Sequence, residues 1–241
     1  MKIDKNLRNL KNKNILVVGG SSGLGLALVK TYLSYGSKVY YISRNKNKLK
    51  NAEHIKLDLL NLNSLESGIE KIKKLKINIL INSAAINYSK PHHKIDVSEW
   101  NRVMHVNLTS VFLICNAVLP YMKRKQYGKI INISSIAGRH RSIVSGIHYV
   151  SSKAALIGYT RQLAYEVAKY NINVNAVCPS QTKTKMYNKT MTKEKEKKLI
   201  KTIPLKRISN INEQIEPIVF ISTDSASYIT GSIVDINGGQ I

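Results

Sequence analysis

The chain has 241 residues, of which 43% are hydrophobic and 22% are charged, and it carries a formal net charge of +24 at pH 7. This length and apolar content fit one globular domain with a substantial core, and they exclude an extended disordered chain. No uninterrupted apolar run approaches the roughly 20 residues of a membrane span, and residues 1–13 lack the apolar stretch of a signal peptide. Cys115 and Cys178 stand in apolar surroundings without metal-like spacing, so we expect a reducing, cytoplasmic setting.

The strong positive charge allows two interpretations. A polyanionic partner, such as nucleic acid or a membrane surface, would call for a concentrated basic patch. The lysines are instead scattered, and the one dense stretch, 183–201, alternates Lys with Glu194 and Glu196. We favour a general enrichment in Lys, Asn and Ile over a specific nucleic-acid or membrane partner. A basic surface would still attract phosphorylated cofactors and acidic carrier proteins.

Short β-branched runs alternate with amphipathic segments along the whole chain. The predicted strands are residues 14–18, 38–42, 54–57, 77–81, 129–133, 172–177 and 232–236. The predicted helices are residues 24–35, 64–75, 98–122, 149–169 and 213–221, and Asp96 with Glu99 marks the start of the third. Repeated strand–helix–strand units imply a single α/β domain over residues 1–241, with a doubly wound, seven-stranded parallel sheet and helices on both faces.

One segment, residues 185–204, departs from this alternation. It is polar, rich in lysine and long for a connection in a compact domain. We interpret it as a substrate lid, with a simple surface helical insertion as the alternative.

The first predicted strand runs directly into a glycine-rich turn, residues 19–25, and the first helix follows. Glycines let the chain turn tightly and let backbone N–H groups approach a pyrophosphate, while the helix adds its positive N-terminal end. After the first strand of an alternating chain, such a turn indicates a dinucleotide site.

Tyr149 and Lys153 lie four residues apart at the start of the predicted helix 149–169, and therefore on one helical face. An ammonium group beside a phenol stabilises the phenolate and lowers the tyrosine pKa from about 10. That shift makes a tyrosine a usable proton donor or acceptor. Taken alone, however, such a pair is more often a surface packing pair.

Several motifs together resemble the short-chain dehydrogenase/reductase family. Gly19, Gly23 and Gly25 have that family's Gly-x-x-x-Gly-x-Gly spacing. The family's catalytic positions are matched by Asn107, Ser135, Tyr149 and Lys153, and the resemblance covers essentially the whole chain. It implies a Rossmann-type fold and an oxidoreductase that moves a hydride between nicotinamide and carbon.

The resemblance also implies a role for each catalytic position. Tyr149 would give a proton to the substrate oxygen, and Ser135 would hydrogen-bond the same oxygen, so both would contact substrate. Lys153 would bind the nicotinamide ribose and lower the pKa of Tyr149, and Asn107 would hold a water linking Lys153 to solvent. The structural alternatives are a strand-end turn for Ser135 and a helix kink for Asn107.

Cofactor contacts are implied in the glycine turn, at the following strand ends and after residues 172–177. These residues are Gly19, Ser21, Ser22, Gly23, Leu24, Gly25, Ser43, Arg44, Asp58, Leu59, Asn82, Ala84, Tyr149, Lys153, Ser180, Thr182 and Thr184. Ser43 stands where NAD-dependent members tend to carry aspartate, and Arg44 can grip a phosphate bidentately. We therefore expect NADP(H), with a solvated turn arginine as the alternative. Ala85, Ser180 and Asn237 depart from the family's usual glycine, glycine and aspartate.

The carboxyl-terminal pattern resembles the 3-oxoacyl-carrier-protein reductases of this family, which favours a β-ketoacyl thioester as the carbonyl substrate. An acidic acyl carrier protein would be drawn to Arg124, Lys125, Lys129 and Lys169, although Gln126 and Tyr170 stand where such reductases often place docking arginines. Another ketone, a sugar or a polyketide intermediate remains open, as does a non-catalytic dinucleotide-binding scaffold.

The family further implies a homotetramer built from helices 98–122 and 149–169. Their apolar positions include Val103, Val111, Phe112, Leu156 and Leu163, which the core of the monomer would also use. We expect no metal site, because His92 and His93 lack suitably spaced partners and are predicted to lie in a loop.

Overall fold

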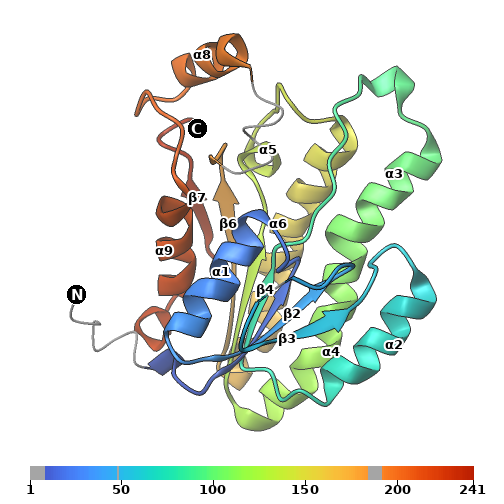
Figure 1. Ribbon diagram of the computed structural model, residues 1–241, viewed down its shortest axis with the longest axis vertical. Helices are drawn as coiled ribbons and strands as arrows, with labels where there is room; N and C mark the ends of the chain where they lie inside the picture. The colour runs from blue at the N-terminus through green and yellow to red at the C-terminus, as the bar shows by residue number, and fades with distance from the viewer. Residues whose placement is uncertain (1–8, 48, 184–191) are drawn as a thin grey trace.

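The computed structural model describes residues 9–47, 49–183 and 192–241, and it shows a seven-stranded sheet in the order β3-β2-β1-β4-β5-β6-β7 (Figure 1). The strands are β1 (Asn14–Val18), β2 (Lys38–Ser43), β3 (Ala52–Lys56), β4 (Ile79–Asn82), β5 (Gly128–Ile133), β6 (Ile172–Pro179) and β7 (Ile233–Ile236). Every neighbouring pair is parallel. The predicted strands and the doubly wound, Rossmann-type fold are confirmed, with strand ends that differ by a few residues.

Helices connect these strands. They are α1 (Gly23–Ser34), α2 (Leu62–Lys73), α3 (Val97–Met104), α4 (Ser110–Lys125), α5 (Ile136–Arg139), α6 (Ile147–Val167), α8 (Lys193–Lys201) and α9 (Ile211–Ile221). Short turns are η2 (His92–Lys94), η3 (His105–Thr109), η4 (Ala168–Tyr170) and η5 (Asp224–Ala226). The sequence predicts neither α5, which is too short for a periodic pattern, nor α8, which has few apolar residues.

The predicted helix 98–122 is one long helical stretch with an irregularity inside it. The turn η3 between α3 and α4 is π-helical, and it contains Asn107. The expected start signal is confirmed, because the side chain of Asp96 accepts a hydrogen bond from the Glu99 amide at 2.8 Å. Single π turns recur at functional sites, so this irregularity directs attention to Asn107.

The sheet is buried on both faces. Leu16 and Val18 of β1 pack in a core with α2, α4 and α6. Ile15 and Val17, which point the other way, pack in a second core with α1 and α9. Because successive strand residues alternate between faces, burial on both sides requires the continuous apolar runs that the sequence shows.

The strand order reverses between β1 and β4, which are neighbours in the sheet although β2 and β3 separate them in sequence. Open α/β sheets bind ligands outside the carboxyl ends of their strands at such a reversal. The loops that follow β1 and β4 therefore form the expected edge for a site.

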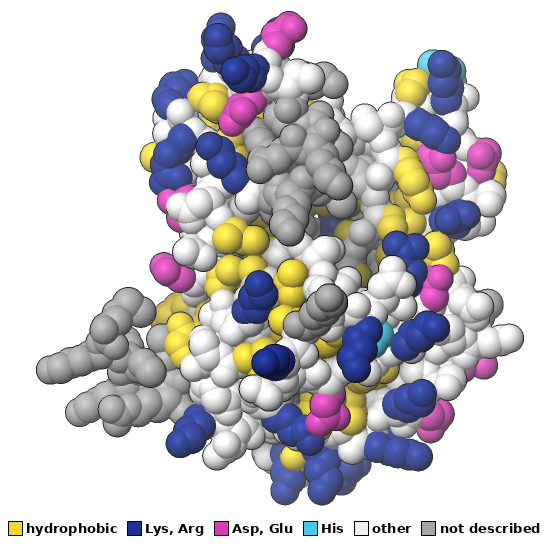
Figure 2. All heavy atoms as spheres, in the orientation of Figure 1, with side chains coloured by type: hydrophobic (Ala, Val, Ile, Leu, Met, Phe, Trp, Pro, Cys, Tyr) yellow, Lys and Arg dark blue, Asp and Glu magenta, His cyan; other side chains and the backbone are white. Residues whose placement is uncertain are grey.

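Lys and Arg side chains are spread over the face shown in Figure 2, with Asp and Glu among them, and they do not form a continuous basic stripe. By length and composition the helical stretch Val97–Lys125 could cross a membrane, with a mean hydropathy of 1.6 over its most apolar window. However, 56% of that window is buried inside the protein. The apolar residues of α4 thus serve the core beside the sheet.

The proposed lid lies partly outside the described residues, since these resume at residue 192. Within 192–204, α8 lies beyond the carboxyl ends of β6 and β7 (Figure 1). A helix in this position fits a lid and a surface insertion equally, so both interpretations stay open.

Candidate active site

A cavity of about 560 Å³ opens at the carboxyl edge of the sheet, where the strand order reverses. Its walls include most of the residues that the sequence predicts. They are Gly19, Ser21, Ser22, Gly23, Leu24, Gly25, Ser43, Arg44, Asp58, Leu59, Ala84, Ser135, Tyr149, Lys153, Ser180 and Thr182. Segments far apart in sequence therefore meet around one space, as the predictions require.

Three predicted residues are not in these walls. Asn82 and Asn107 are buried beside the cavity without lining it. Thr184 lies outside the described residues. Asn82 and Asn107 therefore differ from the other described predicted residues, because their side chains do not face the cavity.

The cavity also has walls that sequence reasoning missed. They are Ile42, Leu57, Leu60, Ser83, Ile86, Val106, Ile133, Ser134 and Pro179, in addition to Ala85, which the sequence had marked as a departure. Most are next to a predicted residue in the chain, so their position at the ends of the predicted strands could have indicated them. Ile86 and Val106 are apolar and carry no chemical signature, and only the fold brings them to the site.

At one end of the cavity, the glycine turn lets two backbone segments approach closely. Gly19 has φ +84°, and a Cβ there would lie 2.8 Å from the backbone of Ala84. A Cβ on Gly25 would lie 2.3 Å from the carbonyl oxygen of Gly19. The N-cap of the next helix, α1, is Ser22, whose side chain forms no capping hydrogen bond. An uncapped helix start beside a glycine turn suits an anionic group such as a pyrophosphate.

Beyond the turn, the end of β2 places Ser43 and Arg44 at the cavity. The Ser43 hydroxyl donates to the carbonyl of Asn45 at 2.7 Å and contacts Nε2 of His54 at 3.0 Å, so its hydrogen-bonding capacity is largely used. Arg44 is exposed and forms no ion pair with a described residue. Its guanidinium is therefore available to a ligand at this end.

Across the cavity, Ser135 and Tyr149 come together from two elements. Ser135 is the N-cap of α5, and its hydroxyl accepts from the Ala137 amide at 3.1 Å. Ser135 also lies close enough to the Tyr149 side chain to lower the pKa of its phenol, although burial has the larger effect. A Cβ on Gly138 would lie 2.6 Å from the carbonyl carbon of Lys153, so this glycine allows α5 to pack on the backbone of α6. Close packing of these helices fixes the Ser135–Tyr149 pair.

Lys153 lies one turn after Tyr149 and is buried. Its ammonium donates to the carbonyl of Ile133 at 2.7 Å and lies 5.7 Å from the centre of the Tyr149 ring. The hydroxyl of Ser134 donates to the Lys153 carbonyl at 2.8 Å. Burial lowers the pKa of Lys153 to about 8, because desolvation disfavours the ammonium.

The pKa of Tyr149 moves in the direction opposite to our expectation. Burial raises it above its ordinary value, and the hydrogen bond with Ser135 only partly offsets that effect. The Lys153 ammonium is not directed at the phenol as we expected, because it donates to the Ile133 carbonyl. A raised pKa keeps the phenol protonated and thus able to donate.

Asn107 connects the end of β4 to the turn that carries Tyr149. Its amide oxygen accepts from the Ile86 amide at 2.9 Å, and its Nδ2 donates to the Ile86 carbonyl and to the Ser152 hydroxyl, both at 3.0 Å. The Ser152 hydroxyl in turn donates to the Tyr149 carbonyl at 2.8 Å. These bonds use the Asn107 side chain on protein groups, and Asn107 does not line the cavity.

Asn82 likewise points into the protein. Its Nδ2 donates to Oδ1 of Asn132 at 2.8 Å, and Nδ2 of Asn132 donates to Thr160 at 2.9 Å. These bonds direct the Asn82 side chain away from the cavity, and its role in cofactor binding stays a prediction. The physical reason for this direction is that Asn82 ends β4 with its side chain directed along the sheet towards the neighbouring strand β5.

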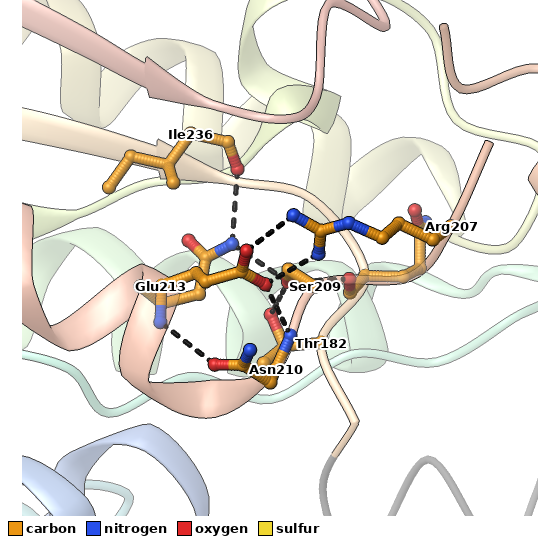
Figure 3. Close-up of polar contacts among 8 residues, drawn as sticks. Thr182, Arg207, Ser209, Asn210, Glu213 and Ile236 are labelled. Carbon is orange, nitrogen blue, oxygen red and sulfur yellow. Dashed lines mark hydrogen bonds and ion pairs between the residues drawn. The ribbon is translucent and has the colours of Figure 1, made fainter. Parts of the chain in front are cut away.

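A polar cluster supports Thr182 at the edge of the cavity (Figure 3). The Ser209 hydroxyl contacts the Gln181 carbonyl at 3.1 Å and Oγ1 of Thr182 at 3.2 Å, and it accepts from Gln214 at 2.9 Å. Arg207 binds both carboxylate oxygens of Glu213. The cluster joins the segment after β6 to the start of α9, so α9 holds Thr182 in place.

The Asn237 departure has a structural explanation. Its Oδ1 accepts from the amides of Gly239 at 3.0 Å and Gln240 at 3.1 Å. An aspartate oxygen would accept the same bonds, so asparagine preserves the turn. Ser180 and Ala85, the other departures, both line the cavity.

His92 and His93 lie in the exposed turn η2. In the part of the chain that the structure describes, no group of His, Cys, Asp and Glu side chains is arranged to hold a metal ion.

Comparison with known proteins agrees with this geometry. The short chain dehydrogenase family matches residues 13–195. The chain is 33% identical to the 3-oxoacyl-[acyl-carrier-protein] reductase of Aquifex aeolicus, over 96% of this chain and 98% of that protein. It is 34% identical to an acetoacetyl-CoA reductase of Shinella zoogloeoides, over 93% and 97%.

Among solved structures, a short chain dehydrogenase of Leptospira borgpetersenii with bound NAD⁺ superposes with a TM-score of 0.90 at 27% identity, covering 100% of this chain and 97% of that one. The chain therefore belongs to the short-chain dehydrogenase family. It is an oxidoreductase of a family that binds nicotinamide dinucleotides.

Proposed function

We propose that this protein is an NADPH-dependent reductase that converts a carbonyl to a secondary alcohol, and that its favoured substrate is a β-ketoacyl thioester. The observation that carries the proposal is the cavity itself, with the glycine turn at one end and Ser135, Tyr149 and Lys153 at the other. Similarity to an oxoacyl-carrier-protein reductase and to an acetoacetyl-CoA reductase supports the thioester.

In this proposal each residue has a distinct task. Bound NADPH would supply the hydride to the carbonyl carbon, and Tyr149 would give its phenolic proton to the oxygen. Its raised pKa suits a donor in the direction of reduction. Ser135, which lines the same cavity as Tyr149, would orient the carbonyl oxygen beside the phenol. The buried Lys153 would bind the nicotinamide ribose.

Asn107 acts indirectly in this proposal. Through Ser152 it holds the carbonyl of Tyr149, and through Ile86 it holds a wall of the cavity. It thus fixes the distance between the two sides of the reacting end. The water-holding role that the resemblance implies for Asn107 stays a prediction beside this one.

The preference for NADPH rests on Arg44. Its exposed guanidinium borders the cavity at the end of β2, and no carboxylate replaces Ser43 to repel a 2′-phosphate. The remaining cofactor contacts would be those predicted residues that line the cavity, with Thr184 as a further contact outside the described range.

An acidic carrier protein is a possible source of the thioester, and the structure changes where it could bind. Arg124, Lys125 and Lys169 are exposed, but Lys129 is buried and donates to Oδ1 of Asn173 at 2.7 Å. The prediction of Lys129 as a docking residue is therefore wrong, because the neighbouring strand β6 covers its side chain and supplies its partner Asn173. The first alternative is reduction of another ketone, a sugar or a polyketide intermediate. The second alternative is a scaffold that binds the dinucleotide without catalysing a reaction.

We also propose a cytoplasmic homotetramer with a substrate lid at residues 185–204. The predicted apolar positions Val103, Val111, Leu156 and Leu163 are buried within the monomer. Phe112 on α4 and Tyr165 on α6, however, are 47% and 84% exposed, which supports a contact between copies along these helices. Sedimentation equilibrium of the wild type and of Tyr165→Glu would test this, with dissociation expected in the variant.

The function is tested by NADPH oxidation with β-ketoacyl thioesters, simple ketones and sugars, using Tyr149→Phe for comparison. Turnover of a thioester that falls about 100-fold or more in the variant is expected, since a general acid contributes that much. Undiminished turnover in Tyr149→Phe would overturn the mechanism. Binding of NADPH without turnover of any carbonyl would favour the scaffold.

A further inference from the structure

The first turn of α6, which carries Tyr149, begins in an unusual way. Its N-cap is Gly146, so no N-cap side chain is present to accept the free amides of the turn. A Cβ at this position would lie 2.5 Å from Cε1 of His148 and 2.6 Å from the carbonyl oxygen of Tyr88. The usual serine, threonine or aspartate cap is therefore sterically excluded.

The imidazole of His148 takes over the missing cap. It is fully buried, and its Nδ1 accepts from the backbone amide of Tyr149 at 2.9 Å. Tyr149 is the third residue of α6, the position whose amide an N-cap side chain ordinarily binds. Because Nδ1 accepts, the neutral ring carries its proton on Nε2.

The opposite side of the ring is held by a charged pair. Nε2 of His148 lies 3.1 Å from one carboxylate oxygen of Glu99, and the other oxygen binds the ammonium of Lys90. The hydrogen bond from Lys90 is the main reason that the pKa of Glu99 is lowered, so this carboxylate is charged and accepts the Nε2 proton. Glu99 itself is held in the first turn of α3, because its backbone amide donates a hydrogen bond to the Asp96 carboxylate.

A second set of contacts holds the same turn from the β4 side. The Gly146 amide donates to the Tyr88 carbonyl at 3.0 Å, and Asn107 reaches the Tyr149 carbonyl through Ser152. The Tyr149 amide also donates to the Gly146 carbonyl at 3.1 Å, so the imidazole is its second acceptor. His148 links this amide to Glu99 of α3, and Ser152 links the Tyr149 carbonyl to Asn107 of η3.

We propose that His148 is a positioning residue for Tyr149. Its imidazole accepts the Tyr149 amide, transmits the fixed position of Glu99 to the start of α6 and keeps the phenol directed at Ser135. This inference rests on the proposed role of Tyr149 as the proton donor. It extends that role to a buried group that does not face the cavity.

Two substitutions at His148 separate its functions. His148→Asn keeps an acceptor oxygen one bond from Cγ, as Nδ1 is, but does not reach Glu99. His148→Phe fills the volume and offers no acceptor. We expect His148→Phe to lower kcat about tenfold to 100-fold while the KM values for NADPH and the carbonyl change little, since small displacements of a reacting group cost this much. His148→Asn should recover part of kcat, because it restores the acceptor for the Tyr149 amide but not the contact with Glu99.

The control is Ser222→Ala, which removes the buried hydrogen bond between Ser222 and Tyr32, a contact beside α9 and away from the cavity. It should lower Tm without changing kcat. Amide hydrogen exchange of peptides covering residues 147–152 is the second readout, because it needs no turnover. Faster exchange in His148→Phe, with protection restored in His148→Asn, is expected.

Wild-type kcat and wild-type exchange in His148→Phe would overturn the inference. Equal losses of kcat and Tm in both His148 variants, in proportion to those of Ser222→Ala, would also overturn it by assigning His148 to stability alone. Failure of the proposed function is distinguishable, since it would show as full activity in Tyr149→Phe or as no carbonyl turnover by the wild type. The exchange measurement would still decide the role of His148 in that event.

Discussion

At the end of the cavity that the proposal assigns to the cofactor phosphates, called the phosphate end, the walls come largely from residues 19–25. At the reacting end they come from the end of β5, from Ser135 before α5 and from α6. The glycine turn needs the absence of side chains, because a Cβ on Gly25 would meet the Gly19 carbonyl. The reacting end needs particular side chains, each held by buried hydrogen bonds such as that from Lys153 to Ile133.

This difference determines which property a substitution at each end should impair. A local backbone turn is disrupted by a single added methyl, and the loss should appear in cofactor affinity and stability together. An end assembled from several helices is disrupted through orientation, and the loss should appear mainly in kcat. The predictions below test this contrast.

The largest effect is expected for Lys153→Met. Removal of the buried ammonium should lower kcat about 1000-fold, because in the proposed function both ribose binding and proton transfer beside Tyr149 depend on it. Steady-state kinetics and NADPH fluorescence titration would measure the two effects separately. A variant with wild-type kcat would show that the reacting end does not depend on this lysine.

Gly25→Ala tests the phosphate end. The added methyl would lie 2.3 Å from the Gly19 carbonyl oxygen, so the turn must open. We expect the free energy of unfolding to fall by about 1–3 kcal/mol, as in other overpacked sites, with NADPH affinity at least tenfold weaker. Gly158→Ala is the control, since a Cβ there meets nothing within 4 Å. Equal behaviour of the two variants in calorimetry and cofactor titration would contradict the contrast.

Arg44→Asp should reverse the cofactor preference without disturbing the reacting end. An aspartate repels a 2′-phosphate and accepts hydrogen bonds from a free ribose, so the ratio of kcat/KM for NADPH over NADH should change about tenfold or more. The kcat with the preferred cofactor should stay near the wild-type value. Unchanged selectivity would remove Arg44 from the cofactor site.

The smallest effect is expected from pH. Lys153, with a pKa lowered to about 8 by burial, loses its proton before Tyr149, whose pKa is raised. The active ammonium form is therefore present below pH 8 and is lost as pH rises through this value. We expect kcat/KM for NADPH, which reports groups of the free enzyme, to fall about tenfold between pH 7 and pH 9. A flat profile to pH 10 would contradict this assignment.

Much of the fold followed from pattern alone. The strand residues 14–18 and the cap at Asp96 with Glu99 were predicted at the positions where the structure has them. Both signals are local, because a two-sided apolar strand and a helix cap depend on neighbouring residues. By contrast, η3 and α5 are short irregular elements whose conformation depends on packing, so the sequence pattern did not indicate them.

The candidate site divides in the same way. Tyr149 and Lys153 were singled out by their spacing and, together with Ser135, by the family resemblance, and all three line one cavity. The orientation of Asn82 and the burial of Lys129 were not predictable, because each depends on which strand lies beside it. His148 gave no signal either, since its partner Glu99 is distant in the chain.

The sequence by itself determined the order of strands and helices, the glycine turn and the residue types that a hydride-transfer site requires. Those features are encoded in periodicity and spacing along the chain. Only the tertiary structure decided which of these residues face the cavity, which way the pKa of Tyr149 moves and what holds its helix turn. The physical reason is that burial and hydrogen-bond partners arise from contacts between distant segments, which spacing along the chain does not specify.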